Sequence, residues 1–205
     1  MNLPNLLTLS RVPFLFAIVA MLAFPWPGSA TCAFVLFIIA AVTDWLDGHF
    51  ARRYRMVSNF GKLMDALTDK ILMVGLFFAL MTLDLMPAPI VLSLFLVLLI
   101  LSREFFITGL RLVAAANGVV LAAEKAGKQK TVTQLLAMGF LLAAPVIGVD
   151  FARLLGTDFD AFAGVVAWIG YGLFGLAALL TVSSGTMYIV KYRDQLFPDM
   201  EDASK

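Results

Sequence analysis

Four aspartates in the N-terminal half of the chain are the residues best suited to chemistry. Asp44 and Asp47 are three residues apart, and Asp65 and Asp69 are four apart, so on helices each pair shares one face. Two adjacent helices would direct four carboxylates at one place, where they repel unless cations or protons intervene. All-oxygen ligands suit Mg²⁺ or Mn²⁺, and with substrate phosphates they could hold two ions. Such a group is typical of metal-assisted phosphoryl transfer.

Two glycines accompany the aspartates. Gly48 follows Asp47, and Gly61 lies one helical turn before Asp65, so neither places a side chain where a ligand approaches. The simpler interpretation is that the acids cap helices or pair with nearby arginines and Lys70 at the water interface. Ionisable groups inside apolar spans are costly and usually functional, which favours the metal site over capping.

The composition is that of a membrane protein. Of the 205 residues, 61% are hydrophobic and only 14% are charged, whereas soluble domains carry roughly 25% charged residues. Apolar runs of about 20 residues, long enough to cross a bilayer, recur along the chain. The net charge of +1 gives no indication of nucleic acid as a partner, and the single Cys32 excludes an internal disulfide.

Hydrophobic runs and breakers predict an all-α, polytopic membrane protein with six transmembrane helices in a compact bundle and one domain, residues 1–205. The breakers are residues 25–28, the stretch around Pro87 and Pro89, and the Gly-rich, acid-bearing segment 148–160. Of the fifteen Lys and Arg residues, only Arg153 falls in these connections, so the positive-inside rule predicts that both termini are cytoplasmic. The predicted spans are 4–24, 30–52, 60–83, 89–115, 132–149 and 162–188.

Glycines are frequent in the last predicted span, where they allow helix backbones to approach closely. Two uses are open for them, packing inside the bundle and a dimer interface. The residues are Gly164, Gly170, Gly172, Gly175 and Gly185.

A second group of basic residues suggests an anion site. Arg103 and Arg111 are eight residues apart, close to two helical turns, so they share a face and could clamp an anion. Lys125, Lys128 and Lys130 follow before the fifth predicted span. The alternative is that the arginines snorkel to the interface, while the lysines only enforce topology or attract anionic lipid. An anion site beside a metal site indicates an acceptor that carries a phosphate.

The aspartate segment resembles the defining motif of the CDP-alcohol phosphotransferase family. In that family the motif carries a two-metal site, a CDP-bound donor, and an acceptor alcohol whose hydroxyl attacks the phosphate and releases CMP. The motif covers 26 residues with eight fixed positions. It is present here as Asp44-x₂-Asp47-Gly48-x₂-Ala51-Arg52-x₈-Gly61-x₃-Asp65-x₃-Asp69.

The resemblance implies a role for each position. Asp44, Asp47 and Asp65 would ligate metal, and Asp69 would both ligate metal and take the proton from the acceptor hydroxyl. Arg52 would hold the donor phosphates. The residues expected to contact the lipid donor are Asn5, Thr8, Gly48, Ala51, Arg52, Ser58 and Gly61. The first two of these are equally consistent with helix capping.

A narrower resemblance, to bacterial phosphatidylglycerophosphate synthases, covers residues 1 to 135. It implies CDP-diacylglycerol as donor and sn-glycerol 3-phosphate as acceptor. The acceptor phosphate would be bound by Arg103, Arg111, Lys128 and Thr131. Gln129 departs from the pattern, because these enzymes often have an aromatic residue there. The motifs that carry the resemblance are Met1-Asn2-Leu3-Pro4-Asn5-x₂-Thr8-x₂-Arg11, Ser102-Arg103-Glu104, Gly109-x-Arg111 and Gly127-Lys128-x-Lys130-Thr131-x₂-Gln134.

We therefore expect a homodimeric enzyme of the bacterial inner membrane that transfers a phosphatidyl group at the cytoplasmic face with Mg²⁺ or Mn²⁺, two ions per site. Two alternatives stay open. The same chemistry would serve inositol phosphate, phosphatidylglycerol or serine as acceptor, although the basic group argues against serine. Alternatively, the four acids would line a path for divalent cations, which gives no reason for Gly48 and Arg52 to accompany them.

Overall fold

The computed structural model is all-α. It describes residues 3–53, 59–116 and 125–192, with side chains for 10–43, 67–68, 70–114 and 127–192. Six long helices occupy these ranges, and the fifth is extended by a π-helical turn and a short α-helix. The elements are α1 (Leu3–Ala23), α2 (Ser29–Arg53), α3 (Asn59–Thr82), α4 (Ile90–Ala116), α5 (Lys125–Pro145), η1 (Val146–Phe151), α6 (Ala152–Leu155) and α7 (Asp160–Lys191).

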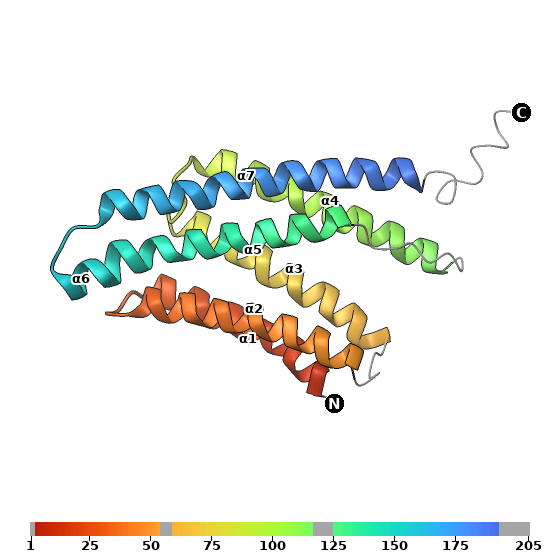
Figure 1. The fold of residues 1–205 in the computed structure, drawn as a ribbon, viewed down its shortest axis with the longest axis horizontal. Helices are drawn as coiled ribbons and strands as arrows, with labels where there is room; N and C mark the ends of the chain where they lie inside the picture. The colour runs from red at the N-terminus through yellow and green to blue at the C-terminus, as the bar shows by residue number, and fades with distance from the viewer. Residues whose placement is uncertain (1–2, 54–58, 117–124, 193–205) are drawn as a thin grey trace, which may run out of the picture.

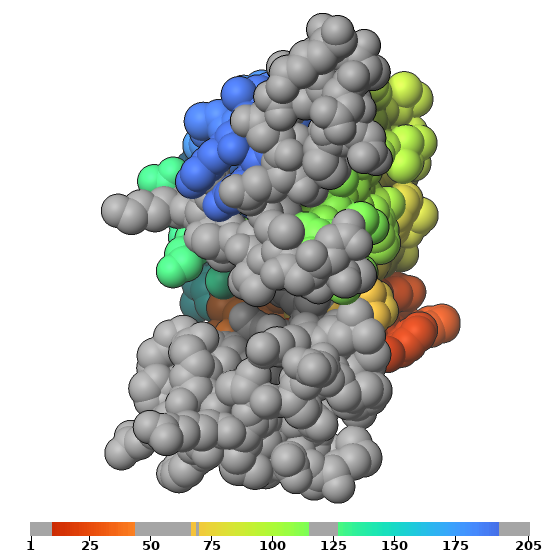
Figure 2. Space-filling model, turned by 90° about the vertical axis from the view of Figure 1, so that its right-hand side faces the viewer, coloured from red at the N-terminus to blue at the C-terminus, as the bar shows by residue number. Residues whose placement is uncertain are grey.

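The long helices run back and forth, so that α1 begins and α7 ends at the same end of the bundle (Figure 1). The last turns of α2 and the first turns of α3 also lie at this end, and they include positions 44, 47, 65 and 69. We call it the motif end. Figure 2 views the molecule from this end, with α4 in green and α7 in blue on the upper half.

Three of the helical segments are long and apolar enough to cross a membrane. Within the described residues these are Ile90–Ala114, Gly127–Leu155 and Asp160–Lys191, and the other apolar helical segments are shorter. Large apolar side chains such as Phe95, Leu112, Trp168 and Leu179 are exposed on the helices, as expected for surfaces that face lipid. The chain is thus a membrane protein with apolar helices. All six predicted spans are confirmed as helices. Three of these helices are long and apolar enough to cross a membrane.

The third predicted connection is wrong over residues 148–155, which are helical. Gly148, a poor helix former, opens the Gly-rich segment that the sequence predicts as this connection. Instead the chain continues through a π-helical turn, in which the Ala152 N–H bonds to the Ile147 carbonyl five residues back. The helix ends only at Gly156, whose φ is 64°. Arg153 therefore lies on α6, and the polar residues from Lys125 onward belong to α5.

The π-helical turn brings Asp150 to the start of α2. Its Oδ1 accepts a hydrogen bond from the Gly28 N–H at 3.0 Å. Its Oδ2 accepts from the Thr31 N–H at 2.8 Å and from the Thr31 hydroxyl at 2.7 Å. A carboxylate at a helix N-terminus satisfies backbone donors and interacts favourably with the helix dipole. Asp150 thus caps α2 from a distant part of the chain.

The core fixes α3 against the α5–α7 pair. Leu76, Met138 and Phe174 come from α3, α5 and α7, and each is fully buried. The Phe77 ring stacks on Phe174 with their centroids 4.4 Å apart. Apolar contacts therefore hold α3, the helix that carries Asp65 and Asp69, against α5 and α7.

Glycine allows close packing at two positions of α7. A Cβ on Gly170 would lie 2.9 Å from the Leu141 backbone nitrogen, so α5 and α7 could not approach as they do. A Cβ on Gly185 would lie 2.9 Å from Cγ of Arg103. Packing inside the bundle is thus confirmed for these two. A Cβ would meet nothing within 4 Å at Gly164, Gly172 or Gly175.

Asp150→Asn should lower the free energy of unfolding by about 1–3 kcal/mol, because the amide keeps one acceptor but turns its NH₂ group towards hydrogen-bond donors. Thermal unfolding in detergent measures the change. Asp84→Asn is the matched control, because Asp84 is exposed and has a φ of 53°, which asparagine tolerates. The control should shift stability by less than about 0.5 kcal/mol. Equal losses would mean that the Asp150 cap contributes nothing.

Candidate functional site

The positions of the predicted metal ligands lie at the motif end, two on α2 and two on α3. The side chains of Asp44, Asp47, Asp65 and Asp69 are outside the described set. Among the side chains that are described, no group of three or more His, Cys, Asp or Glu could hold a metal ion. The metal site therefore stays a prediction. Of the expected donor contacts, Asn5, Thr8, Gly48, Ala51, Arg52 and Gly61 lie on described helices without described surroundings, and Ser58 lies outside the described residues.

The three basic residues predicted to clamp an anion do meet at one place. Arg103 and Arg111 from α4 and Lys128 from α5 line a cavity of about 250 Å³, which α7 closes on one side. We call it the basic cavity. Its lining also includes Lys130, and Glu104 is its one acidic residue among the described side chains. The excess of positive charge suits a phosphate or another anion.

Residues of α7 orient both arginines. Nη2 of Arg103 donates to the Ser184 hydroxyl at 3.1 Å. Nε of Arg111 donates to the Tyr188 hydroxyl at 3.1 Å, and its guanidinium carbon lies 5.2 Å from the centre of the same ring. Only 16% of the Arg103 side chain is exposed. Snorkelling to the interface is therefore wrong for Arg103, which points into the bundle.

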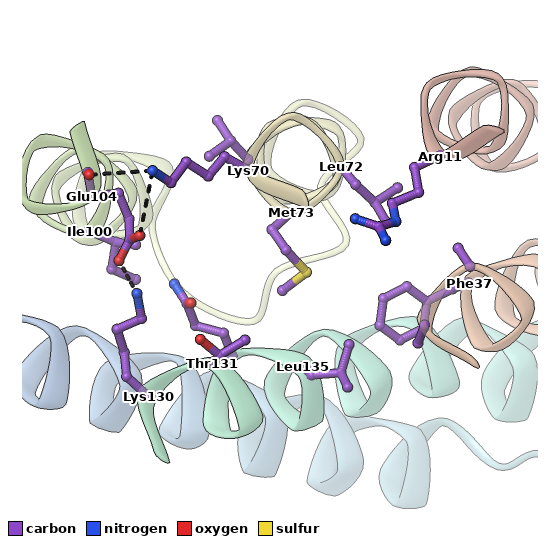
Figure 3. Close-up of a pocket in the computed structure, with 14 residues that line it drawn as sticks. Arg11, Phe37, Lys70, Leu72, Met73, Ile100, Glu104, Lys130, Thr131 and Leu135 are labelled. Atoms are coloured by element: carbon purple, nitrogen blue, oxygen red, sulfur yellow. Dashed lines mark hydrogen bonds and ion pairs between the residues drawn. The ribbon is translucent and has the colours of Figure 1, made fainter. Parts of the chain in front are cut away.

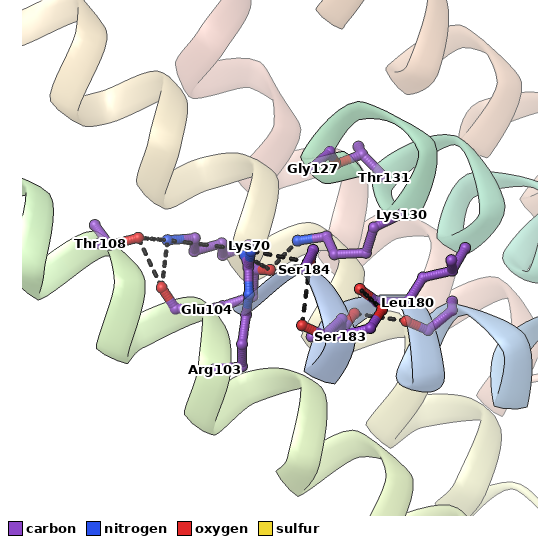
Figure 4. Close-up of polar contacts among 12 residues, drawn as sticks. Lys70, Arg103, Glu104, Thr108, Gly127, Lys130, Thr131, Leu180, Ser183 and Ser184 are labelled. Atoms are coloured by element: carbon purple, nitrogen blue, oxygen red, sulfur yellow. Dashed lines mark hydrogen bonds and ion pairs between the residues drawn. The ribbon is translucent and has the colours of Figure 1, made fainter. Parts of the chain in front are cut away.

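Glu104 joins three helices at the wall of the cavity (Figure 4). Its Oε1 accepts from Nη1 of Arg103 at 3.2 Å and from Nζ of Lys130. Nζ of Lys70, on α3, lies 4.0 Å from Oε2 and also donates to the Thr108 hydroxyl. Lys130 is only 4% exposed, and a charge so deeply buried is costly unless it is paired. The interpretation that Lys130 only sets topology is therefore wrong.

A second cavity lies on the other side of Glu104, in the middle of the bundle (Figure 3). Arg11 of α1 points into it and is 1% exposed. Glu104 and Lys130 line both cavities. Thr131, the fourth predicted phosphate contact, lines this central cavity and does not line the basic one, and its hydroxyl donates to the Gly127 carbonyl at 3.2 Å. The structure thus brings together three of the four predicted acceptor contacts.

Comparison with known proteins gives the context for this geometry. The family model described as CDP-alcohol phosphatidyltransferase matches residues 1–183. The chain belongs to this family. A CDP-diacylglycerol--glycerol-3-phosphate 3-phosphatidyltransferase of Bacillus subtilis is 38% identical over 204 residues, which cover 93% of this chain and 94% of the relative. Enzymes of the same name are 34% identical over 95% of the chain and 97% of the relative in Salmonella typhimurium, and 31% identical over 91% and 93% in Rickettsia bellii.

The sequence-based interpretation of this CDP-alcohol phosphatidyltransferase missed the contribution of α7. Sequence reasoning considered only the glycines of this helix, although the helix also carries a buried polar stripe. Thr181, Ser184 and Tyr188 are spaced by three and four residues and are each at most 3% exposed. This spacing places them on one face of the helix. The spacing of these polar residues in an apolar span was the sequence signal that could have predicted that α7 lines the basic cavity.

Inorganic phosphate should raise the unfolding temperature of the purified protein in detergent without divalent metal, because a ligand that binds only the folded state stabilises it. Gly185→Ala should reduce this stabilisation, because the added Cβ displaces the side chain of Arg103. Gly175→Ala is the matched control on the same helix, where a Cβ meets nothing within 4 Å. A stabilisation that is the same in both variants would contradict anion binding by Arg103.

Proposed function

We propose that this enzyme transfers the phosphatidyl group from CDP-diacylglycerol to sn-glycerol 3-phosphate, giving phosphatidylglycerol phosphate and CMP. The observation that carries the proposal is the basic cavity, in which Arg103, Arg111 and Lys128 meet in a member of the CDP-alcohol phosphatidyltransferase family. An acceptor with a phosphate group fits such a cavity. The relatives from Bacillus, Salmonella and Rickettsia are named for this transfer.

The aspartates form the metal half of the proposed site. Asp44, Asp47 and Asp65 would hold Mg²⁺ or Mn²⁺, two ions per site, and Asp69 would both hold metal and serve as the base. Two features support this assignment: the four positions lie on two helices at the same end of the bundle, and carboxylate oxygens are the ligands these ions prefer. When bound, the ions would neutralise charge that develops on the transferred phosphate.

The donor would be held beside the aspartates. Arg52 binds the donor phosphates, and the small residues of the motif leave room for the nucleotide. The acyl chains enter from the bilayer between helices, because they must stay in hydrocarbon while the reactive phosphate sits at headgroup depth. The proposed donor contacts are Asn5, Thr8, Gly48, Ala51, Arg52, Ser58 and Gly61.

In the proposed reaction the 1-hydroxyl oxygen of the acceptor forms a bond to the phosphorus that carries diacylglycerol. The bond from that phosphorus to the oxygen of CMP breaks, and the hydroxyl proton passes to Asp69. The basic cavity holds the acceptor phosphate, and Ser184 and Tyr188 keep the two arginines in place. The wall of the basic cavity is close to α3, because Lys70, the neighbour of Asp69 in the sequence, contacts Glu104 and Thr108. Thr131 remains a proposed contact of the acceptor.

We also propose six transmembrane spans, cytoplasmic termini and an active site that faces the cytoplasm of a bacterial inner membrane. The start of α1 and the end of α7 share the motif end with most of the basic residues, which the positive-inside rule assigns to the cytoplasm. One domain would comprise residues 1–205. The homodimer rests on the family resemblance alone.

CMP release by the full-length protein in detergent tests the proposal. Separate reactions contain CDP-diacylglycerol, Mg²⁺ or Mn²⁺, and one of glycerol 3-phosphate, inositol phosphate, phosphatidylglycerol or serine. Release should depend on both the metal and glycerol 3-phosphate, and it should stop when EDTA removes the metal. Release with another acceptor alone would reassign the acceptor. Metal flux in vesicles without CMP release from any acceptor would favour divalent-cation transport instead.

Asp69→Asn should reduce CMP release by at least about 10²-fold, because the amide cannot take a proton from the acceptor hydroxyl. Steady-state kinetics with glycerol 3-phosphate measure the loss, and the unfolding temperature reports whether the variant folds. Asp84→Asn makes the same chemical change at an exposed position of the opposite connection and should leave turnover unchanged. Normal turnover by folded Asp69→Asn would remove Asp69 from the role of base.

A further inference from the structure

Glu104 is an acid in a cavity that otherwise suits a phosphate. A carboxylate repels a bound phosphate, and in a partly desolvated site this repulsion is strong. Three cations around Glu104 offset the repulsion, from Lys70, Arg103 and Lys130. Pairing with these cations gives Glu104 a structural use, but the acid also lines the cavity, where it can contact a ligand.

The two oxygens of Glu104 have different surroundings. Oε1 accepts hydrogen bonds from Arg103 and Lys130. Oε2 has one ionic neighbour in the part of the chain that the structure describes, Lys70 at 4.0 Å, which is beyond hydrogen-bond distance. An ionised carboxylate has about four lone-pair sites. Glu104 therefore keeps acceptor capacity at the cavity wall, where 17% of its side chain is exposed.

The location of Glu104 matches the middle of the proposed acceptor. On one side it contacts Arg103, which belongs to the proposed phosphate site. On the other side it lies next to Lys70, which follows Asp69 on α3. Glycerol 3-phosphate has its phosphate at one end, the attacking hydroxyl at the other, and a hydroxyl on the central carbon. A molecule that spanned from the arginines to α3 would pass Glu104, which is close to both Arg103 and Lys70, near its central carbon.

We propose that Glu104 accepts a hydrogen bond from the central hydroxyl of the acceptor and so determines which phosphorylated alcohol is used. The inference deepens the proposed function and rests on it. It predicts that the enzyme selects a three-carbon phosphate with a hydroxyl at the second carbon, in addition to selecting for the phosphate. A site built to pair with a hydroxyl rejects analogues that lack it, because its own polar group is then left without a partner.

The test compares three acceptors that share a phosphate and a primary hydroxyl. Glycerol 3-phosphate has the central hydroxyl, 3-hydroxypropyl phosphate lacks it, and dihydroxyacetone phosphate has a carbonyl there, which cannot donate to a carboxylate. For the full-length enzyme, kcat/KM should be at least about tenfold higher with glycerol 3-phosphate than with either analogue.

Glu104→Gln should reduce this preference by about tenfold, because the charge-assisted hydrogen bond is lost. The preference over dihydroxyacetone phosphate should fall furthest, since the amide NH₂ can donate to the carbonyl. Glu104→Asp, which keeps the carboxylate, should retain part of the preference. Ser184→Ala is the matched control: it removes a contact of Arg103, so kcat/KM should fall equally for all three acceptors and their ratios should stay unchanged.

Equal losses for all acceptors in Glu104→Gln would overturn the inference and leave Glu104 as a structural ion-pair residue. If that variant does not fold, the unmodified enzyme decides the question, because equal use of glycerol 3-phosphate and 3-hydroxypropyl phosphate also overturns it. Absence of CMP release with glycerol 3-phosphate in the unmodified enzyme is a separate result: it removes the proposed function, and the inference falls with it.

Discussion

Three cations converge on the carboxylate of Glu104, and the arrangement of the helices around the basic cavity depends on this interaction. Lys70, Arg103 and Lys130 come from three different helices and meet at one acid in a poorly solvated interior. Removing one partner of a buried ion pair is strongly destabilising, since it leaves an uncompensated charge. The network thus fixes α3, α4 and α5 relative to one another, directly beside the position of Asp69.

The opposite end of the bundle is held by a different polar contact, in which Asp150 caps the start of α2. In a membrane there is little hydrophobic drive between helices, so packing and polar contacts determine how they associate. The apolar middle supplies packing, as at the close approach of Gly170 to Leu141. The two polar contacts supply the register that apolar surfaces alone specify weakly. Polar contacts at both ends of the bundle therefore help to fix the helices that form the motif end.

Much of this arrangement could be predicted from periodicity and charge. The six helices and the shared face of Arg103 and Arg111 follow from patterns within one segment. The helical course of residues 148–155 could not be predicted, because the glycines of this segment suggest a connection, whereas a π-helical turn carries the helix through it. The Asp150 cap joins segments far apart in sequence, which local patterns do not reveal. The aspartate site stays a prediction, since its side chains lie outside the described set.

The polar stripe of α7 consists of hydroxyl groups, and the need to leave the charge of the arginines uncompensated explains this choice. The family match ends at residue 183, whereas Ser184 and Tyr188 follow it and hold the two arginines. A carboxylate in either position would also orient a guanidinium, but it would offset part of the charge that attracts a phosphate. A hydroxyl orients the group without neutralising it, and it is less costly than an acid inside a membrane. The last helix therefore orients the two arginines of the basic cavity without reducing the positive charge of the cavity.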